Sequence, residues 1–282
     1  MSVSRLIGEI RILHRVLEPA DFRSALGAMV AQAPQILVRR NLTPLDKAMS
    51  RDVKINFRGQ ILTIPAGSID RQLASRNDNA TFGAVREMFG SDVYLRAFKP
   101  MPDMDTVIDL GSNRGFFSLI ATKILKARRV IAVEPTADYN AAFAYIAGAN
   151  AIPDGSVTRI NKFMGATDDD KMISLEKLFA DCKVDRVDFL KCDIEGSEYA
   201  TFAGNPDLVK RIANLAMEVH PWCGSTTKLV EFLTSTGLTV MTTDQHGHIV
   251  PTDKALYVYA SRQGQLMPPF FAEGVKAQSP YR

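Results

Sequence analysis

The strongest constraint on the fold is a glycine-containing turn between an apolar β-favouring run and a helical one. The run TVIDL ends at Leu110, the turn GSNRG spans Gly111–Gly115, and FFSLIATKIL follows with helical character. Such a turn lies at the carboxyl edge of a parallel sheet, where open α/β folds bind their ligands. Gly111 permits a tight turn, and Gly115 permits close packing of helix on strand. The turn therefore predicts an α/β fold with a ligand site at this edge.

Short β-favouring runs alternate with helical patterns around this turn, which is typical of βαβ units in a parallel sheet. The predicted strands are Thr106–Leu110, Arg129–Val133, Val157–Asn161, Val187–Cys192, Leu215–Val219, Leu238–Thr243 and Leu256–Ala260. The predicted helices are Gly115–Lys126, Asp138–Ala147, Leu175–Ala180, Ser197–Phe202 and Thr226–Thr236. The last two strands have no helix between them, so we expect them to pair as an antiparallel hairpin at one end of the sheet.

The first hundred residues have a different pattern. Apolar residues recur at helical spacing over Val3–Glu18, which predicts an amphipathic helix that ends at Pro19. We expect a hairpin over Val53–Ile64 and a further helix over Thr81–Phe89. The expected parts of the chain are an N-terminal helix and hairpin cap over residues 1–100, an α/β domain over residues 101–262 and an irregular tail over residues 263–282.

Composition narrows the choice of partner and compartment. Lysine and arginine total 34 against 31 acidic residues, without basic runs, which argues against nucleic acid as the main partner. The three cysteines lack the spacing of a zinc site or a disulfide framework. Charged residues interrupt the first apolar positions, so we expect neither a signal peptide nor a membrane span. We expect a cytoplasmic location instead. The apolar stripe of the first helix would pack on the body of the chain or on a second subunit, which leaves a homo-oligomer open.

An acidic residue ends the second predicted strand, RVIAV, where Glu134 is followed by Pro135. A carboxylate at this place can accept hydrogen bonds from both ribose hydroxyls of a nucleoside. The N–H groups at the start of the helix after Gly115 favour an anionic group, such as the carboxylate of an amino acid-like cofactor. Together the two features predict a nucleoside cofactor held by Asp109, Gly111, Ser112, Asn113, Gly115, Phe116, Glu134 and Pro135, with Asp193 beside its reactive end.

Two nucleoside cofactors, NAD and S-adenosylmethionine, fit such a site, and the turn favours S-adenosylmethionine. Phe116, Phe117 and Ser118 stand where the dinucleotide fingerprint has its third glycine. Bulky residues would crowd a pyrophosphate, and S-adenosylmethionine has none. The antiparallel strand pair at the end of the sheet is also typical of methyltransferases. We therefore expect a Rossmann-like seven-stranded class I methyltransferase sheet, with an N-terminal helical and hairpin extension, that binds S-adenosylmethionine.

The segment after the third predicted strand should lie next to the adenine. Phe163 or Met164 could stack on the ring there. A single aromatic residue or methionine after a strand is more often part of the core. Both interpretations, contact with adenine and packing in the core, therefore remain open. The acidic run Asp168–Asp170 fits a solvated loop better than a metal site.

Charged residues are dense around the end of the fourth predicted strand, in VDFLKCDIEGSEY. Lys191, Asp193 and Glu195 lie at and beyond its carboxyl end, and a buried strand does not carry charge this densely for packing. The fifth strand, NLAMEVHPW, brings His220 to the same edge. These four residues are the catalytic candidates. Alternatively, Glu195 and the nearby Glu198 simply open the next helix, where negative charge suits the dipole.

Two ways of activating a hydroxyl acceptor remain open for these residues. His220, or Asp193 acting with it, could take the hydroxyl proton as a general base. Alternatively, Asp193, Glu195 and His220 could hold a divalent cation such as Mg²⁺ that lowers the pKa of the acceptor. Residue types alone do not decide between a base and a metal.

Several strings resemble the FkbM family of S-adenosylmethionine-dependent methyltransferases: VIDLGSNRGFFSL, IAVEP, ISLEKLF, VDFLKCDIEGSEY and the pair His220-Pro221. The resemblance spans Asp105 to Ser261, and the string that begins at Lys191 is its most specific part. Cys192 stands where isoleucine is common in the family, and Arg114 where a small or apolar residue is usual. The resemblance implies an O-methyltransferase acting on a hydroxyl of a small molecule or glycan, such as a sugar, glycolipid or secondary metabolite.

Other classes of function make different predictions. An NAD-dependent oxidoreductase would be stabilised against heat by NAD, whereas a methyltransferase would be stabilised by S-adenosylmethionine or its demethylated product. A non-catalytic nucleoside-binding module would keep its biological activity in Asp193→Ala and His220→Ala. A nucleic-acid methyltransferase is disfavoured by the weak net charge and by the lack of an Asn/Asp-Pro-Pro-aromatic string after the fourth strand.

Overall fold

The computed structural model describes residues 3–76, 78–202 and 204–268. It separates into two compact units. One unit contains the described residues up to Asp92 together with Asn140–Ile152, and the other contains Val93–Tyr139 and the described residues from Pro153 to 268. The first unit thus takes in a segment from the middle of the chain. Of the expected tail, only residues 263–268 are among the described ones.

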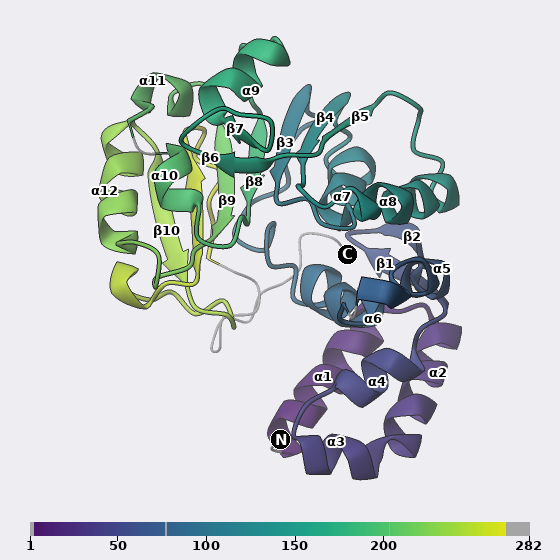
Figure 1. Cartoon of the computed structure of the whole chain (residues 1–282). Coiled ribbons are helices and arrows are strands. Elements are labelled where there is room, and N and C mark those ends of the chain that lie inside the picture. Colours follow the sequence, from purple (N-terminus) through teal and green to yellow (C-terminus); the bar gives the residue numbers. More distant parts are fainter. Residues whose placement is uncertain (1–2, 77, 203, 269–282) are drawn as a thin grey trace. The chain divides into compact units, whose positions relative to one another are not determined.

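The first unit contains a β-hairpin and short helices (Figure 1). Its elements are α1 (Val3–Val16), α2 (Pro19–Ala31), α3 (Ala33–Arg39), α4 (Thr43–Ala48), β1 (Asp52–Phe57), β2 (Gln60–Pro65), α5 (Ala66–Gln72), η1 (Ala74–Arg76), α6 (Thr81–Val85), the π-helical turn η2 (Arg86–Gly90) and most of α8 (Asp138–Ala149). The first predicted helix, the hairpin and the helix that begins at Thr81 are confirmed. The sequence analysis predicts nothing for α2 to α5.

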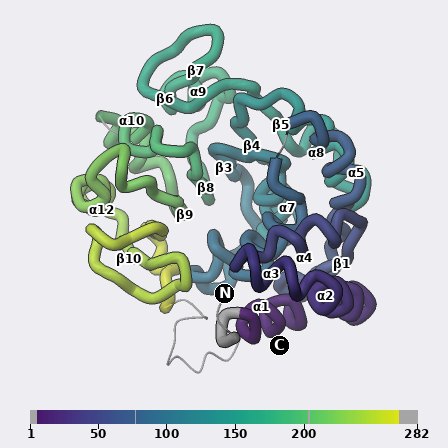
Figure 2. Tube along the Cα trace, turned by 60° about the horizontal axis from the view of Figure 1, so that its bottom comes forward, coloured from purple at the N-terminus to yellow at the C-terminus, as the bar shows by residue number. Residues whose placement is uncertain are grey.

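The second unit is built on a seven-stranded sheet in the order β10-β11-β9-β8-β3-β4-β5. Its strands are β3 (Thr106–Leu110), β4 (Arg129–Val133), β5 (Val157–Ile160), β8 (Phe189–Cys192), β9 (Asn214–Glu218), β10 (Thr239–Thr243) and β11 (Tyr257–Ser261). Figure 2 shows β9, β8, β3, β4 and β5 in this order. β11 runs antiparallel to both β9 and β10, whereas the other pairings are parallel. The predicted methyltransferase sheet with an antiparallel pair at one end is confirmed.

The strand order reverses between β3 and β8. The chain moves outward from β3 to β4 and β5, then returns to place β8 on the other side of β3. Open α/β sheets bind ligands at the carboxyl ends of the strands at such a switch point. All five residues of β3 and all four of β8 are buried, as expected for parallel strands covered on both faces. The topology therefore positions a site at the ends of β3 and β8.

Helices follow most strands of the second unit. They are α7 (Phe116–Lys123), the start of α8, α9 (Leu175–Asp181), α10 (Glu198–Phe202), α11 (Pro206–Val209), α12 (Thr226–Ser235) and η3 (Thr252–Lys254). Ser174 and Ser225 cap α9 and α12, because their hydroxyls accept from the backbone N–H groups three residues later. The short strands β6 (Phe163–Gly165) and β7 (Met172–Ser174) form a separate parallel pair. None of the described helices combines the length and apolar character needed to cross a membrane.

Candidate active site

The turn Gly111–Gly115 reaches across the end of β8. Gly111 has φ +71°, and a Cβ atom there would lie 1.6 Å from the carbonyl oxygen of Asp193. Only glycine fits this approach. The sequence predicts a glycine here for a tight turn. The structure shows a second reason, the close approach of the turn to the backbone of Asp193. Gly111 brings the predicted cofactor turn against the predicted catalytic segment.

Lys191 is a buried cation that ties β8 to the same turn. Its Nζ donates to the carbonyls of Leu110 at 3.1 Å and Gly111 at 2.6 Å, and it lies 3.5 Å from Asp109 Oδ1. Burial lowers the pKa of Lys191, but the nearby carboxylates of Asp109 and Asp193 outweigh burial and raise this pKa above its ordinary value. An ammonium group held in this way does not take a proton. These contacts give Lys191 a positioning role, and its predicted catalytic role stays a prediction.

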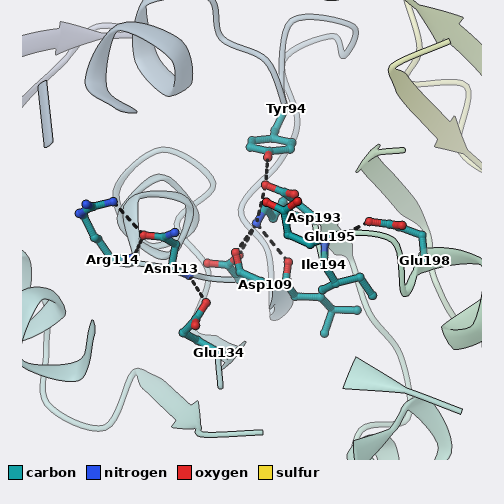
Figure 3. A network of polar contacts seen from close by, with 12 residues as sticks. Tyr94, Asp109, Asn113, Arg114, Glu134, Asp193, Ile194, Glu195 and Glu198 are labelled. Carbon is teal, nitrogen blue, oxygen red and sulfur yellow. Dashed lines mark hydrogen bonds and ion pairs between the residues drawn. The ribbon is translucent and has the colours of Figure 1, made fainter. Parts of the chain in front are cut away.

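Glu134 directly follows β4, and its carboxylate is held against the turn (Figure 3). One oxygen accepts from the N–H of Asn113 and the other from the N–H of Thr136, both at 2.9 Å. Each carboxylate oxygen has a second acceptor site. Glu134 is thus fixed in place and still able to accept from ribose hydroxyls.

An orphaned polar group supports a ligand in this turn. The hydroxyl of Ser112 is buried and has no hydrogen-bond partner in the described part of the chain. Unpaired buried polar groups are rare in proteins and call for a partner. The start of α7 adds backbone N–H groups and the positive end of the helix dipole. Glu134, Ser112 and the start of α7 together fit the ribose and the amino acid part of S-adenosylmethionine.

Other residues predicted to bind the cofactor have different surroundings. Asp109 is fully buried and accepts from the hydroxyl of Ser118 at 2.8 Å, so it links the end of β3 to α7. Phe116 is buried at the start of α7. Met164 belongs to the hydrophobic core, whereas Phe163 is 55% exposed. Contact of Phe163 or Met164 with adenine stays a prediction.

Asp193 follows β8 and is oriented by Tyr94, a residue that the sequence analysis missed. The phenol of Tyr94 donates to Asp193 Oδ2 at 2.9 Å (Figure 3). Burial raises the pKa of Tyr94 well above its ordinary value, and the nearby carboxylates of Asp193 and Glu218 add to this effect. The phenol is therefore a permanent donor. The Asp193 side chain stays 27% exposed, so a ligand can reach it.

His220 follows β9 and is held by Glu198. The imidazole is 5% exposed, and Nδ1 lies 2.8 Å from Glu198 Oε1. The same oxygen accepts from the N–H groups of Ile194 and Gly196, both at 3.2 Å. Because the carboxylate is an acceptor, Nδ1 carries a proton and donates it to Glu198, and Nε2 faces Glu195. Glu198 does open α10, but its fully buried side chain orients His220, a function that the sequence analysis did not predict.

Three of the predicted catalytic residues converge. Asp193, Glu195 and His220 each bring one ligand-type atom within 4.8 Å of the others. We call these residues the Asp193–Glu195–His220 cluster. Glu195 Oε2 lies 3.4 Å from His220 Nε2, and the Glu195 side chain is 85% exposed. The backbone of Glu195 has φ 53°, a left-handed conformation that is uncommon for glutamate.

Two glycines pack the loop after His220 against the loop that carries Glu195. A Cβ on Gly196 would lie 2.3 Å from Cys223 Sγ, and one on Gly224 would lie 2.4 Å from the ring of Tyr199. Trp222, 75% exposed, lies edge-on to the His220 ring with the centroids 4.9 Å apart. These close approaches fix the imidazole relative to Glu195.

Comparisons with known proteins extend this description. Among solved structures, the methyltransferase FkbM from Methylobacillus flagellatus KT is 17% identical, with a TM-score of 0.43, over 78% of this chain and 66% of its own, just under two thirds. A precorrin-6y C5,15-methyltransferase from Geobacter metallireducens GS-15 is 16% identical over 57% of this chain and 82% of its own, with a TM-score of 0.38. An rRNA methylase from Streptococcus thermophilus is 12% identical over 63% of this chain and 92% of its own, with a TM-score of 0.39.

The comparison with curated proteins finds no match. A family model does match, and it covers residues 156–249. This segment contains β8, β9 and the whole Asp193–Glu195–His220 cluster. The chain therefore carries a methyltransferase FkbM domain match over residues 156–249, and the resemblance predicted from the sequence is confirmed there.

Proposed function

We propose that this chain is an S-adenosylmethionine-dependent O-methyltransferase acting on a hydroxyl of a small molecule or glycan. The observation that carries the proposal is the placement of the Asp193–Glu195–His220 cluster. The backbone of Asp193 lies directly against Gly111 of the predicted cofactor turn, so the cluster and this turn share one edge of the sheet. A methyltransferase needs this juxtaposition of a nucleoside site and proton-accepting groups.

The residues divide into two groups by chemistry. Glu134, Ser112 and the start of α7 would hold the nucleoside and its amino acid part. When bound, the cofactor supplies a methyl group on a positively charged sulfur. Asp193, Glu195 and His220 form the second group, which would orient the acceptor hydroxyl toward this methyl group and take up its proton. Alignment supplies roughly 7–11 kcal/mol in such reactions, and proton removal adds about 10²- to 10⁴-fold.

The rival functions explain less of the site. An NAD-dependent oxidoreductase needs room for a pyrophosphate, and the buried Phe116 and Phe117 occupy the start of α7. A non-catalytic nucleoside-binding module needs no oriented imidazole, whereas Glu198 fixes His220. A cytoplasmic location, a small-molecule or glycan partner and the lack of a nucleic-acid partner stay predictions.

The test begins with the cofactor and continues with the acceptor. The thermal unfolding temperature should rise with S-adenosylhomocysteine and stay unchanged with NAD. Tritiated S-adenosylmethionine is then incubated with the full chain and a panel of sugars, glycolipids and phenols, and the products are analysed by mass spectrometry. A methyl ether supports the proposal, and a methylamine or methyl ester as the only product contradicts O-methylation. Stabilisation by NAD alone would contradict the proposed methyltransferase function.

A further inference from the structure

We propose that the Asp193–Glu195–His220 cluster is a binding site for a divalent cation of the Mg²⁺ or Mn²⁺ class. Two carboxylates and one imidazole form a donor set that suits such ions. The inference deepens the proposed function, and the part that rests on that function is the role of the cation toward the acceptor hydroxyl. Binding of the cation itself can be tested without any acceptor.

The distances within the cluster fit a shared ion. Bonds of about 2.0–2.2 Å to one ion place neighbouring ligand atoms roughly 3–4 Å apart. Glu195 Oε2 and His220 Nε2 are 3.4 Å apart, within this range. The widest separation in the cluster is below 4.8 Å. Because the Glu195 side chain is exposed, its rotation can bring its carboxylate closer to the other two ligand atoms.

Both of the less mobile ligands have a supporting partner of the kind that metal sites use. Histidine ligands commonly donate their second N–H to a carboxylate, which fixes the ring and the tautomer. Glu198 accepts from Nδ1 of His220 in this way, at 2.8 Å. Tyr94 holds the carboxylate of Asp193 at 2.9 Å and leaves its other oxygen for a ligand. Both partners orient their ligand atoms as metal sites require, although a carboxylate on Nδ1 also suits a general base.

The buried imidazole offers an independent observation. His220 is 5% exposed, and its Nε2 lies 3.4 Å from Glu195 Oε2. A divalent cation that binds this nitrogen and the two carboxylates would be a shared partner for all three groups. Glu195 carries the second carboxylate on a left-handed backbone, with φ 53°. Strained residues of this kind cluster at functional sites.

The charges around the cluster also favour a cation. The carboxylates of Asp109, Asp193, Glu195 and Glu198 lie around Lys191 and His220. Lys191 is the cation that pairs with Asp109 and Asp193. A divalent ion would balance the remaining negative charge. When bound, it would supply a Lewis acid to an acceptor oxygen at the place where the proton must leave.

The test measures Mn²⁺ binding to the full chain after dialysis against EDTA. Electron paramagnetic resonance of free Mn²⁺ and calorimetry should both give one saturable site. Glu195→Gln should weaken this site by at least about tenfold, and because Glu195 is exposed, the variant should fold normally. His220→Gln should abolish binding, and Tyr94→Phe should weaken it by roughly 10- to 100-fold. His248→Gln is the matched control, because Nδ1 of His248 also pairs with a carboxylate, Asp244 at 2.8 Å, outside the cluster.

Two results would overturn the inference. One is the absence of saturable Mn²⁺ binding at millimolar concentrations. The other is binding that Glu195→Gln and His220→Gln leave unchanged. Either result would leave His220 as a general base without a metal. Calorimetry of S-adenosylhomocysteine on the metal-free protein tests the proposed function separately, so a failed cation site with intact cofactor binding would remove only this inference.

Discussion

The carboxylate of Glu198 lies 2.8 Å from Nδ1 of His220, and both side chains are buried. Glu198 is itself held by the N–H groups of Ile194 and Gly196, which stabilise its negative charge. This pair decides which nitrogen of His220 is available to Asp193 and Glu195. The chemistry of the cluster therefore depends on Glu198, a fully buried residue outside the cluster.

His220 should exist as the Nδ1–H tautomer. Long-range ¹H–¹⁵N correlation spectra can show this, because the chain has only four histidines. Glu198→Ala should destabilise the fold by roughly 2–5 kcal/mol and mix the tautomers, since three donors lose their acceptor. An Nε2–H tautomer in the wild-type protein would contradict the assigned role of Glu198.

Replacing Lys191 by methionine should destabilise the protein by about 3–5 kcal/mol. The change leaves the buried carboxylate of Asp109 without its cation, and the carbonyls of Leu110 and Gly111 without a donor. Urea unfolding measures the loss. Lys177→Met is the control, since its exposed i,i+4 pair with Asp181 is worth only about 0.3–0.5 kcal/mol. Equal, small losses in both variants would show that Lys191 does not hold the turn.

The two glycine substitutions Gly111→Ala and Gly148→Ala should have opposite effects. Gly111→Ala forces a Cβ into the carbonyl of Asp193 at a left-handed φ, which should cost roughly 2–5 kcal/mol. Gly148 lies within α8 with open space around it, so alanine there should stabilise the helix by roughly 0.5–1 kcal/mol. Chemical denaturation of both variants checks the contrast. A stable Gly111→Ala variant would mean that the turn and β8 are not in contact.

Stability should depend on Tyr94 at alkaline pH. The folded protein raises the pKa of Tyr94 above its ordinary value of 10.0, so the folded state favours the protonated phenol. The resulting stabilisation is complete below the unfolded pKa and is lost as the pH rises through the folded pKa. The difference in unfolding free energy between wild type and Tyr94→Phe should therefore stay constant up to a pH of about 10 and shrink above it. A difference that grows with pH would contradict the buried, neutral phenol.

The sequence was most informative where local pattern and topology agree. β3 and β4 begin and end at the predicted residues, because short β-favouring runs bounded by turn residues leave little choice. The convergence of Asp193, Glu195 and His220 was predictable too, since the carboxyl ends of neighbouring parallel strands meet.

Other features depend on tertiary contacts that no local pattern reports. Tyr94 lies far from β8 in sequence and reaches Asp193 only through the fold. The role of Glu198 follows from the distance to His220, whereas its position alone fits a helix start equally well. The short helices α2 to α5 lack strong periodicity and depend on packing within their unit.

The measurement that tests the account most directly is calorimetric titration of S-adenosylhomocysteine into wild type and Glu134→Ala. The account predicts binding to the wild type and a loss of roughly 1–3 kcal/mol in the variant, because a fixed carboxylate that accepts from the ribose is removed. Glu176→Ala, at an exposed site on α9, should bind as wild type does. Equal affinity in wild type and Glu134→Ala, or no binding to either, would contradict a nucleoside site at the ends of β3 and β4.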